Sequence, residues 1–157
     1  MIYNIYTDGS CRNNGFTNAI GAWGYITIVD GALADQDWAV QVNGVTNQMM
    51  ELEAAIQGCS SVYLKLEPLD TVNIYTDSAY LERCYKEKWY EKWESNGWVN
   101  SKKQPVANRS QWEDLIPFFK DSRYTFYKVK GHSDNYYNSV VDQMVQEATA
   151  LVVHGRL

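Results

Sequence analysis

The chain has 157 residues and a net charge of −5 at pH 7, and 45% of its residues are apolar and 14% aromatic. This length and apolar content suit one domain, 1–157, with a sizeable buried core, and they exclude a disordered protein. The negative charge argues against a generic basic nucleic-acid binder, but it leaves room for a local basic patch.

The N-terminal part predicts three strands joined by short connections. The runs rich in β-branched and aromatic residues are IYNIYT (2–7), AWGYITIVD (22–30) and WAVQVNG (38–44). The stretch DGSCRNNGFTNAIG predicts a loop after the first strand, in which we expect Gly9 to open a backbone turn. A second loop passes through Gly31 and Asp35. Such short spacings favour an antiparallel meander.

The next segment changes to the period of a helix. Apolar residues recur three and four positions apart over 48–66, which predicts an amphipathic helix, and Pro68 is a stop signal just beyond it. TVNIYT (71–76) predicts a fourth strand. The helix before it makes this strand a candidate parallel neighbour of an earlier one.

The C-terminal half predicts further helices and one more strand. The helical segments are 78–96, which ends at Asn96-Gly97, then 110–121, and the span from Tyr137 to Leu151. Ser110 is a plausible N-cap, with Glu113 completing a capping box. RYTFYKV (123–129) predicts the fifth strand. The order predicts an α/β fold with a single five-stranded mixed sheet, its first three strands antiparallel, flanked by helices.

Two nearly identical stretches, IYTDGS at 5–10 and IYTDSA at 74–79, each end a predicted strand in an aspartate. If these strands are parallel neighbours, Asp8 and Asp77 emerge at one edge of the sheet, where α/β proteins usually build their sites. The alternative is that Asp and Gly simply mark the ends of strands, as turn residues do.

Other acidic residues and a histidine are candidates for the same site. Glu51 lies at the border of the apolar face of its helix, whereas Glu53 lies outside it and is expected to face solvent. His132 sits in a Gly- and Ser-containing loop, where a histidine is often merely exposed. Periodicity does not decide between Asp134 and Asp142 as a further site residue. A cluster of carboxylates favours Mg²⁺ or Mn²⁺ over zinc, and two such ions suit phosphoryl transfer.

Residues 85–112 combine aromatic and basic side chains. The segment holds four of the six tryptophans, and its six basic and three acidic residues give it a charge of +3, so the rest of the chain carries −8. Interleaved aromatics and bases are typical of nucleic-acid platforms. The alternative is an amphipathic helix whose Trp89 and Trp93 share one inward face.

The composition does not point to disulfides, zinc or a membrane. Cys11, Cys59 and Cys84 contain no C-x-x-C pair, so we expect three reduced thiols. The N-terminus has no basic leader followed by a long apolar stretch, and no apolar run approaches the roughly 18 residues of a membrane span. We expect a soluble, cytoplasmic monomer without a signal peptide.

The motif order TDGS, MEL at a helix start, TDS, and GHS followed by Asn138 and Asp142 resembles type 1 ribonuclease H from about Ile2 to Ala148. The resemblance implies an endonuclease that cuts the RNA strand of RNA–DNA hybrids with two divalent ions, giving 5′-phosphate and 3′-hydroxyl ends. It implies Asp8, Glu51, Asp77 and Asp142 as the metal ligands, which decides against Asp134. It also implies that His132 helps proton transfer or product release.

The same resemblance implies a set of substrate contacts. Asn47 and Gln48 match minor-groove contacts, and Thr46 with Asn13 or Asn14 matches positions near a DNA phosphate. The segment 85–112 resembles a basic protrusion that holds the DNA strand. The remaining expected contacts are Ser78, Trp89, Lys92, Trp93, Lys102, Lys103 and Asn138.

Three features depart from the family pattern. The first loop is longer, so the choice between Asn13 and Asn14 stays open. Ala79 replaces a polar contact. Glu87, Glu91 and Glu94 dilute the positive charge of the protrusion, so we expect it to hold the substrate weakly by electrostatics, with a shallow dependence of binding on salt.

Two rival functions are those of another metal nuclease of similar fold and of a non-catalytic hybrid-binding module. The GHS loop argues against the first, and the intact carboxylates argue against the second.

Overall fold

The computed structural model describes residues 1–129 and 135–155. The strands are β1 (Ile2–Arg12), β2 (Ile20–Val29), β3 (Ala32–Val42), β4 (Thr71–Thr76) and β5 (Tyr124–Lys128). The helices are α1 (Asn47–Tyr63), α2 (Ala79–Glu87), α3 (Trp89–Asn96), α4 (Arg109–Phe119) and α5 (Tyr136–Val153). This is the predicted order of elements, and the α/β fold with a five-stranded mixed sheet is confirmed.

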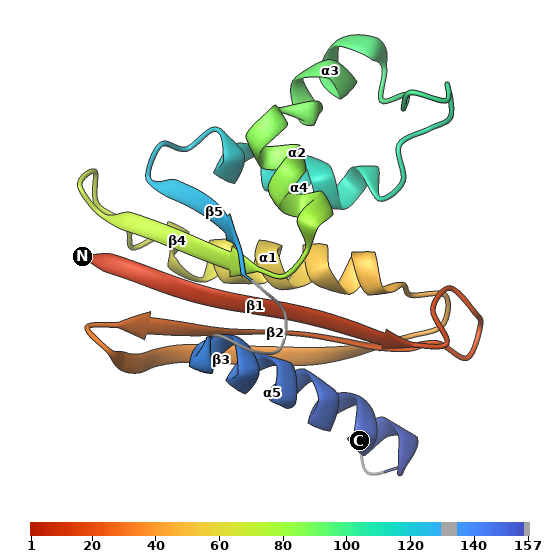
Figure 1. Cartoon of the computed structure of the whole chain (residues 1–157), viewed down its shortest axis with the longest axis horizontal. Helices are drawn as coiled ribbons and strands as arrows, with labels where there is room; N and C mark the ends of the chain where they lie inside the picture. Colours follow the sequence, from red (N-terminus) through yellow and green to blue (C-terminus); the bar gives the residue numbers. More distant parts are fainter. Residues whose placement is uncertain (130–134, 156–157) are drawn as a thin grey trace.

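The sheet has the order β3-β2-β1-β4-β5, with β1, β4 and β5 parallel and the β1–β2–β3 meander antiparallel. Helix α1 packs on one face of β1 and β2, and α5 packs on the other (Figure 1). The main core lies on the α1 side and extends under α2 to α4, whereas Tyr6, Ile26 and Val141 form a smaller cluster beneath α5.

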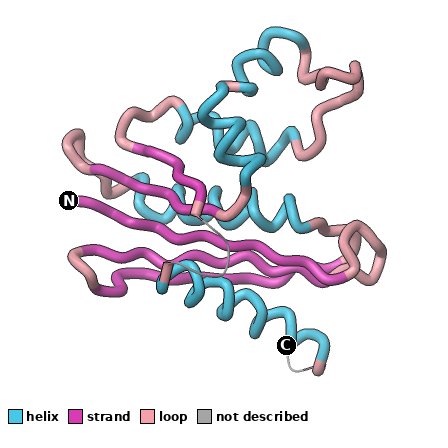
Figure 2. The backbone as a smooth tube through the Cα atoms, viewed as in Figure 1, coloured by secondary structure: helices cyan, strands magenta, loops and turns pink. Residues whose placement is uncertain are grey.

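Helix α3 and the loop that follows it project away from the sheet, as the tube in Figure 2 shows. We call α3 together with residues 97–108 the protrusion. Its base is aromatic, because Trp93 packs against Trp98 and against the fully buried Trp112 of α4.

All three cysteines are free thiols. Among the described residues, no helix is long and apolar enough to span a membrane.

The first hairpins differ from the prediction. Strand β1 does not end before Asp8 but continues to Arg12, because β2 pairs with it as far as the Arg12–Ile20 pair. Strand β3 starts at Ala32, directly after a turn in which Asp30 and Gly31 both have positive φ. Residues 32–35, expected in the loop through Gly31 and Asp35, therefore belong to β3.

Two helix boundaries also differ. The predicted helix over 78–96 is broken at Lys88, whose left-handed conformation (φ 55°) ends α2 and begins α3. Helix α4 begins after Asn108, which is also left-handed and makes no side-chain cap bond. Ser110 lies inside this helix, so the predicted capping box does not form. Glu113 instead forms an ion pair with Arg109, in which Arg109 Nε lies 3.2 Å from Glu113 Oε1.

Candidate metal centre

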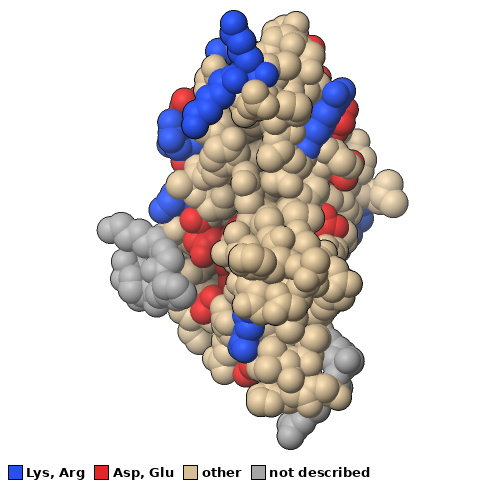
Figure 3. Space-filling model, turned by 90° about the vertical axis from the view of Figure 1, so that its right-hand side faces the viewer, with Lys and Arg blue, Asp and Glu red and all other residues tan. Residues whose placement is uncertain are grey.

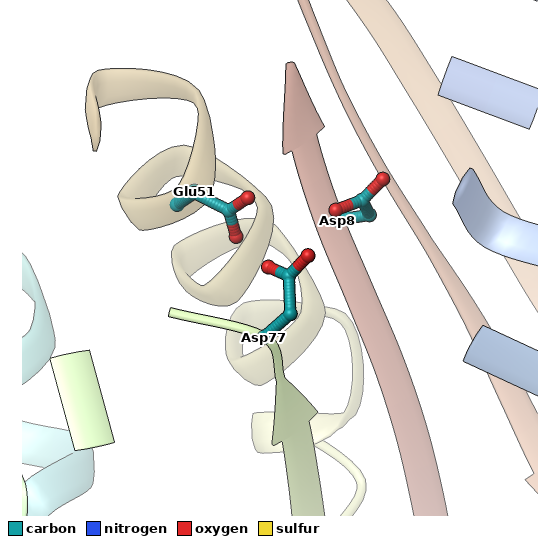
Figure 4. Close-up of side chains that lie close together, drawn as sticks. All are labelled: Asp8, Glu51 and Asp77. Carbon is teal, nitrogen blue, oxygen red and sulfur yellow. The ribbon is translucent and has the colours of Figure 1, made fainter. Parts of the chain in front are cut away.

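Three carboxylates from different elements meet at the edge of the sheet (Figure 4). Parallel pairing of Tyr6 with Tyr75 places Asp8 of β1 level with Asp77, which directly follows β4. Glu51 reaches them from α1. One oxygen from each of Asp8, Glu51 and Asp77 lies within 4.8 Å of the others. Strand β1, the end of β4 and helix α1 therefore bring together three of the four predicted metal ligands.

Gly9 allows α1 to approach β1 this closely. A Cβ atom at Gly9 would lie 2.2 Å from the carbonyl carbon of Met50 and 2.3 Å from the backbone nitrogen of Glu51. The expected backbone turn at Gly9 is wrong, since the residue lies within β1 and pairs with Trp23. Its lack of a side chain, rather than its conformational freedom, is what the site requires.

The electrostatics of the cluster favour a bound cation. Asp8 is only 3% exposed. Burial, together with the neighbouring Asp77 and Asp142, raises its pKa from 3.8 to about 9, although the Gly9 backbone N–H opposes the rise. Burial and the charges of Asp8 and Asp77 raise the pKa of Glu51 as well. Asp8 Oδ2 and Glu51 Oε2 are buried without a hydrogen-bond partner. Such oxygens fit the coordination shell of Mg²⁺ or Mn²⁺.

The fourth predicted carboxylate adjoins these three. The side chain of Asp142, on α5, is half-buried and close enough to Asp8 to help raise the pKa of that carboxyl. Asp134 and His132 lie outside the described residues. Glu53 does not face solvent as expected, because it is half-buried and accepts hydrogen bonds from Gln57 and Gln111.

Comparison with known proteins decides the family. The family model described as RNase H matches residues 2–150, nearly the whole chain. The chain belongs to the RNase H family. The ribonuclease H of Clostridium botulinum (strain Hall) is 40% identical over 144 residues, which cover 92% of this chain and 93% of that protein. The ribonuclease H of Caldanaerobacter subterraneus subsp. tengcongensis is 38% identical over 146 residues, which cover 93% and 90%.

Solved structures of other RNase H proteins share the fold. The PFV RNase H domain superposes with a TM-score of 0.77 at 23% identity, covering 95% of this chain and 94% of that domain. LC11-RNase H1, solved in complex with an RNA/DNA hybrid, superposes with a TM-score of 0.69 at 21% identity, covering 96% of this chain and 99% of that one. The predicted resemblance to type 1 ribonuclease H is therefore confirmed.

In this RNase H chain, the N-terminus of α1 lies beside the carboxylates. Thr46 is the N-cap and accepts a hydrogen bond from the Met49 backbone at 3.1 Å. Asn14 Oδ1 accepts a hydrogen bond from the Asn47 backbone at 2.5 Å, which ties the first loop to the helix. Asn13 is exposed and left-handed (φ 56°) and does not make this bond. The exposed Asn47 and the half-buried Gln48 are both open to a ligand.

Two other residues expected to contact the substrate, Ser78 and Asn138, are a helix cap and a buried side chain. Ser78 is the N-cap of α2, and its hydroxyl accepts a hydrogen bond from the Leu81 backbone at 3.1 Å. Asn138, in the first turn of α5, is only 4% exposed, so its side chain is not open to a duplex. This burial argues against its expected role as a direct substrate contact.

The protrusion presents a cleft of about 330 Å³ lined by aromatic and polar side chains, which are Tyr80, Trp89, Lys92, Trp93, Val99, Asn100 and Ser101. Trp89 is half-buried, whereas Trp93 is only 6% exposed, so the inward-packing alternative holds for most of the Trp93 ring. Lys92, Lys102 and Lys103 are exposed. Figure 3 shows the basic side chains gathered at this end of the molecule.

Two of the three acidic residues of the segment 85–112 pair with bases outside it. Glu87 pairs with Arg83 of α2, and Glu94 pairs with Lys120, which follows α4. Within the described part of the chain, no ion pair holds Lys92, Lys102 or Lys103. These three ammonium groups are therefore available to a polyanion.

One residue of the site surroundings was not predicted from the sequence. Gln111 of α4 donates from Nε2 to the Met49 carbonyl oxygen at 2.9 Å and to Glu53 at 3.3 Å. These bonds join the base of the protrusion to the first turns of α1. They link residues about 60 positions apart, so no local pattern in the sequence announces them.

We expect Mg²⁺ to stabilise the protein more as the pH rises. The folded pKa of Asp8, about 9, lies above its ordinary 3.8. Its contribution to stability is therefore fully present below about pH 4 and is lost as the pH rises towards 9. Metal binds the deprotonated carboxylates and removes this loss. Thermal unfolding with saturating MgCl₂ or with EDTA, at about pH 5 and about pH 8, measures the difference. An equal Mg²⁺ effect at both pH values would contradict the expectation.

Proposed function

We propose that the chain is an endonuclease that hydrolyses the RNA strand of RNA–DNA hybrids and leaves 5′-phosphate and 3′-hydroxyl ends. The observation that carries the proposal is the meeting of Asp8, Glu51 and Asp77 within 4.8 Å, with buried unpartnered oxygens, in a chain of the RNase H family. The hybrid bound in the structure of LC11-RNase H1 supports this choice of substrate.

Asp8, Glu51, Asp77 and Asp142 would hold the metal. When bound there, two Mg²⁺ ions, or Mn²⁺ in their place, would supply a polarised water and a counter-charge for the leaving 3′ oxygen. The chain fixes the carboxylates on a strand, a strand end and two helices, so little reorganisation is needed when the phosphate arrives. The Gly9 backbone N–H favours the charged forms of Asp8 and Glu51. His132 would assist proton transfer or product release.

The substrate would lie across the carboxylates, between the protrusion and the N-terminus of α1. Lys92, Lys102 and Lys103 would hold phosphates of the DNA strand, and the half-buried ring of Trp89 with the exposed edge of Trp93 would line its path. Asn47 and Gln48 would contact the minor groove, where the RNA strand displays its 2′-hydroxyl groups. Thr46, with Asn14 or Asn13, would contact a DNA phosphate beside the N-terminus of α1. Ser78 would lie near the cleaved strand.

One cleavage assay tests the proposal. The protein is incubated with a hybrid labelled on either strand, with single-stranded RNA, and with duplex DNA, each in Mg²⁺ and in EDTA. We expect cleavage of the RNA strand of the hybrid only, and only with metal. Cleavage of duplex DNA would favour the rival metal nuclease, and binding without cleavage would favour the non-catalytic module.

We also propose that the enzyme acts as a monomer, since one chain supplies all four carboxylates. We propose the cytoplasm as the place where it acts.

A further inference from the structure

We infer that Arg12 binds a phosphate of the RNA strand close to the phosphate that is cleaved. The inference rests on the proposed function and names a substrate contact on the side of the carboxylates opposite the protrusion. It starts from the correction to β1, because the residues after Asp8, expected to form a loop, form a strand that extends to Arg12.

The strand places Arg12 in line with the catalytic aspartate. Side chains alternate along a strand, so Asp8, Ser10 and Arg12 point to one face. Ser10 accepts a hydrogen bond from Gln146 of α5 at 3.2 Å, and Asp142 of the same helix raises the pKa of Asp8, so this is the face that α5 covers. Arg12 follows Asp8 by four residues, roughly 13 Å along the strand.

The backbone of Arg12 is held firmly although its side chain is exposed. Arg12 forms the last pair of the β1–β2 ladder, with Ile20. The loop that follows is tied down where Gly15 donates to the Val45 carbonyl at 2.8 Å and where Asn14 accepts from Asn47. Only the side chain of Arg12 therefore needs to be ordered by a ligand, which limits the entropy lost on binding.

A positive side chain at Arg12 would offset the repulsion between the carboxylates and a polyanionic substrate. The carboxylate cluster repels a polyanion, and the free lysines of the protrusion attract it on one side only. Within the described residues, no salt bridge involves the Arg12 guanidinium. Figure 3 shows acidic side chains near the middle of this face, with basic side chains both above and below them. A guanidinium binds a phosphate through two parallel hydrogen bonds.

The RNA strand is the natural partner because Asp8, in the same row of side chains, belongs to the cluster that takes the scissile phosphate. The DNA strand would contact the protrusion and the N-terminus of α1, to which Asn14 is tied, and these lie on the α1 face of the sheet rather than on the α5 face to which Arg12 points. A strand whose phosphate lies at Asp8 continues past Ser10, and the side chain of Arg12 extends the polar surface that Ser10 and Gln146 form there.

The test compares Arg12→Ala with Lys65→Ala, which removes the same charge at the far end of the sheet. Lys65 lies over the ring of Tyr3, nine residues before Arg12 and roughly 30 Å along β1. Hybrid binding is measured by fluorescence anisotropy in EDTA at several salt concentrations, and cleavage is measured in Mg²⁺. For Arg12→Ala we expect a KM raised about threefold to tenfold, an unchanged kcat, and a salt slope shallower by about 1. Lys65→Ala should match the wild type.

Neutral phosphonate linkages identify the strand. Placed in the RNA strand beside the cleavage site, they should weaken wild-type binding and remove the difference between wild type and Arg12→Ala. Placed in the DNA strand, they should leave that difference intact. An Arg12→Ala salt slope equal to that of Lys65→Ala, or a difference that only DNA-strand phosphonates remove, would overturn the inference. Failure of the wild type to cleave would overturn the proposed function instead, because the anisotropy measurements test Arg12 without catalysis.

Discussion

Replacing Asp77 with asparagine is expected to reduce metal-dependent cleavage of a hybrid by at least about 10²-fold, a loss of the size seen when one charge-stabilising group is removed from an active site. Asparagine keeps the shape of the side chain but removes the charge that would hold metal beside Asp8 and Glu51. The loss should appear in kcat and in kcat/KM at saturating Mg²⁺. The matched control is Asp30→Asn, which removes an exposed carboxylate from the β2–β3 turn, where asparagine also tolerates the left-handed backbone.

The same substitution should stabilise the metal-free protein. The charge of Asp77 is one cause of the raised pKa of Asp8 and of Glu51, so its removal relieves repulsion among buried carboxylates. In EDTA at neutral pH we expect the melting temperature to rise by a few degrees, since about 1 kcal/mol corresponds to roughly 2–4 °C at this size. Asp77→Asn that cleaves as well as Asp30→Asn, or that melts below the wild type in EDTA, would contradict this account of the cluster.

Most of the site could be predicted because its signals are local. The period of the apolar residues in 48–66 placed Glu51 at the border of the apolar face of its helix, and so predicted that it points towards the sheet. The repeated IYTD stretches predicted neighbouring parallel strands, and the Tyr6–Tyr75 pairing confirms this. Asp142 was different, because periodicity did not separate it from Asp134. Only the motif order favoured it, and its effect on the pKa of Asp8 shows that it lies near the cluster.

The features that could not be predicted depend on partners distant in the sequence. Whether β1 ends at Asp8 or continues to Arg12 depends on whether β2 supplies a partner, and the Gly- and Asn-rich composition of the segment suggested otherwise. Gln111 reaches Met49 across the α1–α4 contact, so its role is visible only when the helices are packed. Lys88 and Asn108 adopt left-handed conformations that set helix boundaries without glycine, the usual signal for them.

Replacing Gly9 with alanine is expected to lower both stability and activity. The new Cβ would meet the backbone of Met50 and Glu51 at 2.2–2.5 Å, and backbone cannot rotate away as a side chain can. Helix α1 would have to shift from β1. Overpacking of this kind costs about 1–3 kcal/mol or more, which corresponds to a fall in melting temperature of several degrees. Because Glu51 belongs to the displaced turn, we expect at least about a 10²-fold loss in kcat/KM, since small misplacements of catalytic groups have effects of this order.

Gly24 provides a matched control, because it pairs directly with Asp8 on β2. A Cβ there would approach Met144 Cε at 2.7 Å, and this flexible side-chain end can move aside. Gly24→Ala should therefore keep a larger share of its activity than Gly9→Ala at equal loss of stability. Melting temperatures in EDTA and in Mg²⁺ separate the two effects. A displaced Glu51 also weakens metal binding, so Mg²⁺ should stabilise Gly9→Ala less than Gly24→Ala. If both variants gain equally from Mg²⁺ and cleave alike, the close approach at Gly9 serves packing alone and does not set the position of Glu51.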